Sequence, residues 1–546
     1  MTIDPAAAGP AAPAQVPRAR PGMIRSSMIY SGFTLISRMM GFVRDLVVTY
    51  YMGASATFVA DAYTTALAFP NLFRRIFAEG AFAAAFVPAY SRSLEQDGEE
   101  VADVLAADAM AALLAMTVAL TVFAELAMPW IIYLYSPGFA AVPGKIQLTI
   151  TLTMITMPYL PCMAIYAHLA GVLNARNRFV LSAGAPILLN VWTLVAVLPT
   201  HSPRQAAVFA SWGVLIAGVT QAALLWWGVR RSGANVNWRL PRLTPEIRRL
   251  IGLALPGAFA ASVQQVNVFV SQFLVSHVNG ARAWLAVCDR LYQLPQGLVG
   301  VSIGVALLPR LSRAVHSGDT AEAGAAMDQA VTVSMALTLP AAAALAAMPF
   351  FLVDGLYTRG EFRTYDALRT AQALQQYGWG VPAFVLAALY SRAFFARQDT
   401  RTPMNYAVVS VVVNVIAGIV LFHLIGVAGI AAATSLAAWL NVAMMAATLA
   451  RRGEYAPSAR ARSKLIRIFA ASVALGLLLA GAAHERALLE APLAHIHLGP
   501  LHAKEMVILA VTAAAACVYP VLLFASGGLT LAELRGVLRR GAAPLP

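Results

Sequence analysis

Two neighbouring stretches in the last third of the chain, PMNYAVVSVVVNVIAGIVLFH at 403–423 and GVAGIAAATSLAAWLNVAMMAATLA at 426–450, decide the fold class. Neither stretch contains an acidic residue, a lysine or an arginine. Each is long enough to supply the 20 or so apolar residues with which a helix crosses the core of a bilayer. The apolar runs are continuous, whereas a membrane β-barrel needs strands of alternating polarity. We therefore predict an all-α, polytopic membrane protein.

The composition of the whole chain favours the same class. Of the 546 residues, 60% are hydrophobic and only 12% are charged, and the mean hydropathy is +0.69. Soluble proteins carry about 25% charged residues, so this chain cannot cover a water-facing surface of its size. The formal net charge of +14 fits the arginine excess that orients membrane proteins better than it fits binding to nucleic acid.

Apolar segments of membrane-spanning length recur along the chain, and we count about fourteen of them. They cover 26–50, 58–91, 104–135, 146–173, 180–199, 206–229, 250–278, 284–309, 326–353, 365–395, 403–423, 426–450, 465–483 and 505–526. The second and eighth segments contain Pro, Gly and charged residues, which predicts broken or bent helices. With the N-terminus in the cytoplasm, alternating loops place most Arg and Lys on the inner side. This asymmetry predicts that both termini are cytoplasmic.

Two short motifs occur twice in the chain, and the two copies of each are six predicted helices apart. PAYSR at 88–92 is echoed by PRLSR at 309–313, and NARNR at 174–178 by ARQDTR at 396–401. An even displacement keeps the orientation of the helices, so the halves would be parallel repeats with a substrate site between them. The predicted organisation is a disordered cytoplasmic tail at 1–22, six-helix lobes at 23–231 and 247–452, two additional helices within 463–530, and a cytoplasmic tail at 531–546.

Several arginines lie inside the predicted spans, where each costs about 2.5–3.5 kcal/mol and usually faces a cavity. The candidate substrate-binding residues are Arg38, Arg44, Arg74 and Arg290, from the first, second and eighth segments. A guanidinium binds phosphate through two parallel hydrogen bonds and stays charged at any relevant pH. The group therefore predicts an anionic substrate. The alternative is that each arginine only locks helix packing through an internal ion pair.

Four more charged residues are candidates for charge balance or gating, namely Asp45, Asp61, Arg75 and Glu79. Asp45 can neutralise an arginine of its own helix, either Arg38 or Arg44. Arg75 and Glu79 have the i,i+4 spacing of a helical ion pair. Asp45 and Glu79 each stand near an arginine, which favours neutralisation over catalysis.

At these residues the chain resembles the lipid II flippase (MurJ/MviN) family. The resemblance rests on SRMMGFVRD at 37–45, PNLFRRIFAEGAF at 70–82, DRLYQLP at 289–295, LYTRGEF at 356–362 and ARQDTRTP at 396–403. It implies a fourteen-helix transporter, not an enzyme, of the multidrug/oligosaccharidyl-lipid/polysaccharide exporter superfamily. The implied activity is flipping of lipid II, the undecaprenyl-diphosphate-linked peptidoglycan precursor, from the inner to the outer leaflet of the bacterial cytoplasmic membrane, for cell-wall synthesis.

The resemblance also implies a central cationic cavity for the diphosphate and sugars, containing the four candidate arginines, and a groove for the polyprenyl tail on the last two helices. The expected partners are lipid II, membrane lipids and the cell-wall synthesis machinery. No cofactor is expected, and the energy would come from the membrane potential or a monovalent cation. One departure is that ALAF at 66–69 lacks the basic residue that family members often have before Pro-Asn.

Two other classes of function stay open from the residues alone: a flippase for another polyprenyl-diphosphate glycan, and a membrane enzyme acting on lipid-linked sugars. The three cysteines, Cys162, Cys288 and Cys517, lie in apolar segments and are predicted to be packing residues. Histidines at 495, 497 and 502 could bind a metal, but they are in a loop with no acid or cysteine close by, so we predict no metal site.

Overall fold

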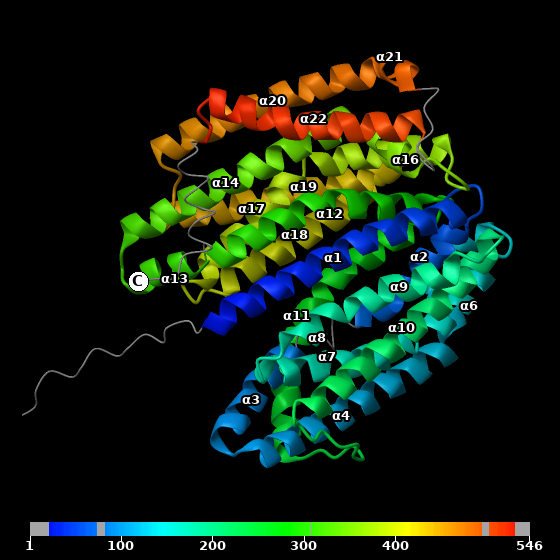
Figure 1. The fold of residues 1–546 in the computed structure, drawn as a ribbon, viewed down its shortest axis with the longest axis vertical. Helices are drawn as coiled ribbons and strands as arrows, with labels where there is room; N and C mark the ends of the chain where they lie inside the picture. Colours follow the sequence, from blue (N-terminus) through cyan, green and yellow to red (C-terminus); the bar gives the residue numbers. More distant parts are fainter. Residues whose placement is uncertain (1–20, 74–81, 307, 494–501, 530–546) are drawn as a thin grey trace, which may run out of the picture.

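The computed structural model describes residues 21–73, 82–306, 308–493 and 502–529, and every element within these ranges is helical (Figure 1). The first half of the chain forms α1 (Pro21–Met52), α2 (Val59–Phe73), α3 (Phe82–Gln96), α4 (Glu99–Leu126), α5 (Met128–Tyr135), the 3-10 helix η2 (Pro137–Ala141), α6 (Lys145–Thr156), α7 (Tyr159–Ala175), α8 (Phe179–Gly184), α9 (Pro186–Val197) and α10 (Pro203–Arg231). Helix α1 thus begins inside the segment 1–22 that was expected to be a tail.

The second half forms α11 (Pro245–Val275), α12 (Ala281–Ala306), α13 (Leu308–His316), α14 (Thr320–Ala347), α15 (Pro349–Tyr357), α16 (Thr364–Gly378), α17 (Val381–Phe395), α18 (Arg401–Ile425) and α19 (Val427–Arg451). The chain then continues through α20 (Ala459–His484), α21 (Arg486–Glu490), the 3-10 helix η3 (Ala491–Leu493) and α22 (Ala503–Ala525). The long helices coincide closely with the predicted spans.

Several predicted spans are pairs of shorter helices. A proline stands in the first turn of the second helix in the pairs α4–α5, α8–α9, α14–α15 and α16–α17. Proline ends one helix and starts the next because it has no N–H and its ring clashes with the preceding turn. Helices α16 and α17 meet at 40°. The second span, expected to be irregular, contains α2 and α3 on either side of residues outside the described ranges.

Among the described residues, nine helical segments are long and apolar enough to cross a membrane, or ten if α16 and α17 count as one bent span. The chain is therefore a multi-pass membrane protein, and the count of fourteen spans stays a prediction. Helices α1 and α12 have 32 and 26 residues, which is ample length. They are not among these segments, and both carry the charged groups described below.

The repeated motifs at 174–178 and 396–401 follow α7 and α17 and adopt the same local structure. Each helix is followed by a turn with a left-handed residue that is not glycine, Asn177 with φ 59° and Gln398 with φ 62°. The next N–H then bonds to the carbonyl five residues earlier, at 2.8 Å for Arg178 and 3.1 Å for Asp399. This is the hydrogen-bond pattern of a helix that stops at a left-handed residue. The two halves of the chain therefore share this helix-ending turn.

The halves are joined tightly where α1 ends and α2 and α12 begin, and we call this the closed end (Figure 1). Here Glu361 N donates to Tyr50 O at 3.0 Å, and Asn279 Nδ2 donates to Ser55 O at 2.6 Å. At the opposite end, ion pairs stay within one half: the 3.0 Å contact of Arg176 with Asp103 and the contact of Arg310 with Glu322. The hydrogen bonds of Glu361 with Tyr50 and of Asn279 with Ser55 thus join the two halves at the closed end.

The last two long helices lie along the outside of the second half, where α20 packs on α14 and α22 lies beside α20 (Figure 1). Their shared core includes Ile468, Leu475 and Tyr519, with Phe351 of α15. An ion pair of Arg486 with Asp354 at 2.5 Å ties this pair of helices to α15. Both helices expose large apolar side chains along their other faces, as a lipid-facing position requires.

Candidate functional site

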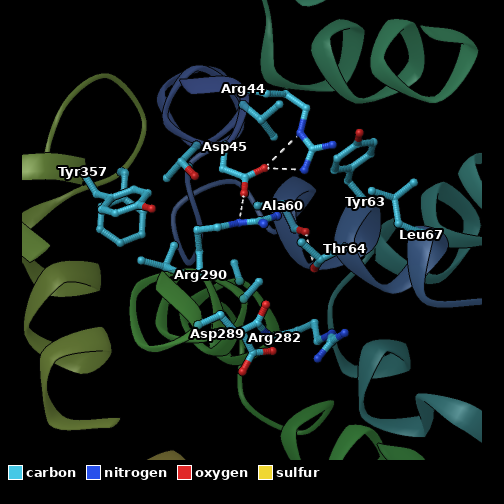
Figure 2. A pocket seen from close by; sticks show the side chains of 18 of the residues that line it. Arg44, Asp45, Ala60, Tyr63, Thr64, Leu67, Arg282, Asp289, Arg290 and Tyr357 are labelled. Atoms are coloured by element: carbon cyan, nitrogen blue, oxygen red, sulfur yellow. Dashed lines mark hydrogen bonds and ion pairs between the residues drawn. The ribbon is translucent and has the colours of Figure 1, made fainter. Parts of the chain in front are cut away.

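A cavity of about 440 Å³ lies between the halves, near the closed end (Figure 2). Its size is within the range of ligand pockets, about 300–1,000 Å³. Side chains of α1, α2 and α12, of the end of α15 and of the segment that follows α15 form its walls. The charged and polar lining residues are Arg44, Asp45, Thr49, Tyr63, Thr64, Asn71, Arg282, Asp289, Arg290, Gln293 and Tyr357. Three arginines face two aspartates, so the lining is net positive.

One carboxylate stands between two guanidiniums in this cavity. Asp45 Oδ1 accepts hydrogen bonds from Arg44 Nη2 at 2.7 Å and Nε at 3.0 Å, and Asp45 Oδ2 pairs with Arg290 Nε (Figure 2). The side chains of Arg44, Asp45 and Arg290 are 16%, 23% and 34% exposed, so an anion in the cavity can reach them. We call these three residues the charge triad. One negative charge between two positive ones leaves it able to bind a further anion.

The positions of the triad follow from the helices that carry it. Arg44 and Asp45 belong to the last third of α1, and Arg290 lies on α12, which crosses beside it. The sequence predicts that Asp45 neutralises Arg38 or Arg44, and the structure confirms the pair with Arg44. It adds Arg290 of the other half as the second partner, which spacing along one helix could not reveal.

Arg38 lies outside the cavity lining. Its guanidinium rests on Gly297 of α12, where a methyl group in place of the glycine hydrogen would be 1.6 Å from Arg38 Nη1. Within the described ranges, Arg38 forms no ion pair. The absence of a side chain at Gly297 thus allows the guanidinium to lie directly against the backbone of α12, two turns beyond Arg290. The candidate residues Arg74, Arg75 and Glu79 lie outside the described residues.

Asp61 is fully buried and does not line the cavity, although the sequence groups it with the cavity charges. Its carboxylate accepts hydrogen bonds from Lys145 Nζ at 2.6 Å, Gly280 N at 2.7 Å and Ala283 N at 2.9 Å. The two backbone donors belong to the free N–H groups at the start of α12, where a carboxylate is favoured. Asp61 therefore joins α2 and α6 to α12 at the closed end, and the partner that the sequence missed is Lys145.

Asp366 makes a second connection at the closed end. Its Oδ1 accepts from Ser55 N at 3.1 Å, Ser55 Oγ at 2.5 Å and Trp284 Nε1 at 3.0 Å. Asp366 and Trp284 are buried, and the three residues come from the segment after α1 and from α16 and α12. Like the Asp61 connection, this one must break if the halves separate here.

The cavity contains functional candidates that sequence reasoning passed over. Arg282, Asn71 and Gln293 all line it, and the predicted spans leave Arg282 in a loop because it stands just before the eighth span. A signal was present in the spacing, since Arg282, Asp289 and Arg290 recur at intervals of seven and eight residues and so fall on neighbouring faces of one helix.

In the part of the chain that the structure describes, no group of three or more His, Cys, Asp or Glu side chains is placed to hold a metal ion. His495 and His497 lie outside that part. Among the cysteines, Cys288 is buried and donates to Thr370 O at 3.3 Å, as a packing residue would. Cys162 is partly buried, and Cys517 is exposed on α22, which corrects its prediction as a packed residue.

A multi-pass helical bundle with a charged cavity between two halves defines a membrane transporter, and solved structures have the same fold. A multidrug resistance MATE family transporter of the MOP superfamily, in an inward-facing conformation, aligns with a TM-score of 0.65 at 13% identity over 78% of this chain and 98% of its own. A lipid II flippase MurJ in an inward closed conformation aligns with a TM-score of 0.73 at 23% identity over 91% and 98%.

The sequence comparisons give the family. The family model "Lipid II flippase MurJ" matches residues 48–489. A probable lipid II flippase MurJ of Rhizobium meliloti is 38% identical over 527 residues, 95% of this chain and 97% of that protein. The lipid II flippase MurJ of Burkholderia cenocepacia is 32% identical over 469 residues, 85% of this chain and 90% of that protein. The chain belongs to the lipid II flippase MurJ family, a family of transporters.

Proposed function

We propose that this protein flips lipid II from the inner to the outer leaflet of the bacterial cytoplasmic membrane by alternating access. The observation that carries the proposal is the charge triad of Arg44, Asp45 and Arg290, which lies in a cavity between two halves of a family member. The diphosphate of lipid II is the anion that this net-positive group would bind, because guanidiniums hold phosphate oxygens through charge-assisted hydrogen bonds.

The triad suits a substrate that must be released as well as bound. When the diphosphate arrives, its oxygens compete with Asp45 for Arg44 and Arg290. When the diphosphate leaves, Asp45 pairs again with Arg44 and Arg290, so neither guanidinium is left without an anionic partner. Asp45 thereby lowers the affinity of the two arginines for phosphate to a level from which the substrate can dissociate.

The proposed orientation places both termini and the arginine-rich loops in the cytoplasm, following the positive-inside rule. The closed end then faces outward, and the diphosphate enters laterally from the inner leaflet while the lipid tail stays in the bilayer. Because the substrate is anionic, the membrane potential assists its outward movement by about 2.3 kcal/mol per charge per 100 mV. A monovalent cation is the alternative source of energy.

In the same proposal the polyprenyl tail lies along the lipid-facing side of α20 and α22, and the exported precursor passes to the cell-wall synthesis machinery. Arg74 and Arg38 add positive charge along the path of the head group. Glu79, four residues after Arg75, would pair with that arginine and so balance part of the positive charge.

The experiment is complementation of cells depleted of their own lipid II flippase, with outer-leaflet lipid II assayed directly. The native chain is compared with Arg44→Ala and Arg290→Ala, and with Arg204→Ala as a control, at matched membrane levels. Arg204 is exposed in the first turn of α10. We expect the native chain and the control to restore outward lipid II and the two triad variants to fail. A native chain that inserts and restores nothing would make another polyprenyl-diphosphate glycan the substrate.

A further inference from the structure

Helix α12 presents two arginines to the cavity, Arg282 in its first turn and Arg290 eight residues later. At a rise of 1.5 Å per residue, their backbones are about 12 Å apart along the helix. Figure 2 shows the Arg290 side chain reaching toward Asp45, whereas the Arg282 side chain extends away from the charge triad. The cavity therefore has two separate cationic positions.

The two arginines differ in how their charges are satisfied. Arg290 is paired with Asp45. Arg282 makes no ion pair with any described residue, and its Nε is buried with no hydrogen-bond partner among them. Buried guanidinium N–H groups are normally hydrogen-bonded, so the Nε–H of Arg282 still has a hydrogen bond to donate. An anion entering the cavity can accept this hydrogen bond.

The position of Arg282 gives the order in which a substrate would meet the two sites. Arg282 follows the segment whose N–H groups, those of Gly280 and Ala283, are held by Asp61 at the closed end. Arg282 thus lies at the closed end of the cavity, which a molecule entering from the other end of the protein reaches last. A head group that enters on a lipid anchor brings its lipid-distal part to Arg282 while its lipid-proximal part is level with Arg290.

We propose that Arg282 binds a second anionic group of the substrate, a carboxylate on the peptide part of the head group, while the charge triad holds the diphosphate. This inference rests on the proposed function. The two phosphates of a diphosphate share one bridging oxygen, so a single diphosphate cannot occupy both positions. A planar guanidinium whose Nε–H has no partner among the described residues can donate two parallel hydrogen bonds to the oxygens of a carboxylate. Arg282 therefore selects head groups that carry an acidic peptide.

The test measures binding to the full-length protein in lipid nanodiscs with two probes: complete lipid II, and the undecaprenyl-diphosphate disaccharide that lacks the peptide. We expect Arg282→Gln to raise the Kd for complete lipid II about tenfold, which corresponds to the loss of one charge-assisted contact. The Kd for the peptide-free probe should change less than about twofold. Arg282→Lys keeps the positive charge but cannot donate two parallel hydrogen bonds. Its Kd for complete lipid II should therefore lie between those of the native chain and of Arg282→Gln.

Arg204→Gln removes the same charge from an exposed position and serves as the matched control. Equal losses for both probes in Arg282→Gln would show that Arg282 acts on the diphosphate, and unchanged binding of both would show that it only packs. Either result overturns the assignment. If the native chain binds neither probe, the proposed function itself fails, and this outcome is distinguished from the other two by the native protein alone.

Discussion

Asp45 of α1 and Arg290 of α12 form an ion pair across the cavity, although they belong to different halves of the chain. Arg44 contacts the other carboxylate oxygen at 2.7 Å, so Asp45 separates two positive charges. Asp45→Asn should lower the free energy of unfolding by about 1–2 kcal/mol, because it leaves the two guanidiniums facing each other. Adding Arg290→Gln should recover part of that loss. Thermal unfolding in detergent measures the stability of the single and double variants. If the effects of Asp45→Asn and Arg290→Gln are additive, the two residues are not coupled and the prediction is wrong.

Gly297 should be required for the position of Arg38. A methyl group there would meet Arg38 Nη1. Because that atom is the end of a flexible side chain, Gly297→Ala should change the free energy of unfolding by less than about 1 kcal/mol. It should nevertheless reduce lipid II export, since the guanidinium is displaced. Gly252→Ala on α11 is the control, as nothing lies within 4 Å of the added methyl. Equal export by both variants would show that the site of Arg38 is unimportant.

Gly53 and Gly360 allow the closed end to form. Both have positive φ, 65° and 59°, and a side chain would collide with backbone atoms, 2.5 Å from Glu361 O and 2.4 Å from Tyr50 O. Gly144 has φ 80° and open space around it, so Gly144→Ala measures the backbone strain alone, about 1–2 kcal/mol. We expect Gly53→Ala to destabilise the protein more than Gly144→Ala in the same thermal assay. A loss no larger than that of the control would mean that the two segments can separate freely.

The pair of Asp61 with Lys145 should behave as a buried ion pair, since the two side chains are 0% and 1% exposed. Lys145→Met leaves the carboxylate without its cation and should lower the free energy of unfolding by about 3–5 kcal/mol. Asp61→Asn together with Lys145→Met should lose less than Lys145→Met alone. Expression level and thermal unfolding measure the effect. A loss of stability much smaller than predicted for Lys145→Met would show that this ion pair does not stabilise the closed end.

Sequence reasoning predicts the helices well, because a bilayer imposes one length and one composition on every span. It also predicts that Arg44 and Arg290 face inward, since charge is expensive in lipid. It fails where the answer depends on which helices meet. The predicted spans leave Lys145 and Arg282 in loops, because residues at the end of a span resemble loop residues in the sequence. The fold buries Lys145 fully and Arg282 in part. The pairing of Asp45 with Arg290 could not be predicted either, because no spacing along the sequence shows that α1 and α12 meet.

The central claim is that the closed end must open for lipid II to cross, and a reversible lock tests it most directly. The side chains of Ser55 and Asp366 meet across the closed end, where Ser55 Oγ donates to Asp366 Oδ1 at 2.5 Å. Thiols at the two positions, Ser55→Cys with Asp366→Cys, can therefore be joined by a short bis-methanethiosulfonate linker, which forms a reducible disulfide with each thiol. The native Cys162, Cys288 and Cys517 are first replaced by alanine, and the Ser55→Cys single variant is the control. Lipid II flipping is then measured in proteoliposomes before and after reduction. We expect no flipping by the fully cross-linked protein and recovery once the disulfides are reduced. Undiminished flipping while the disulfides are intact would contradict the account.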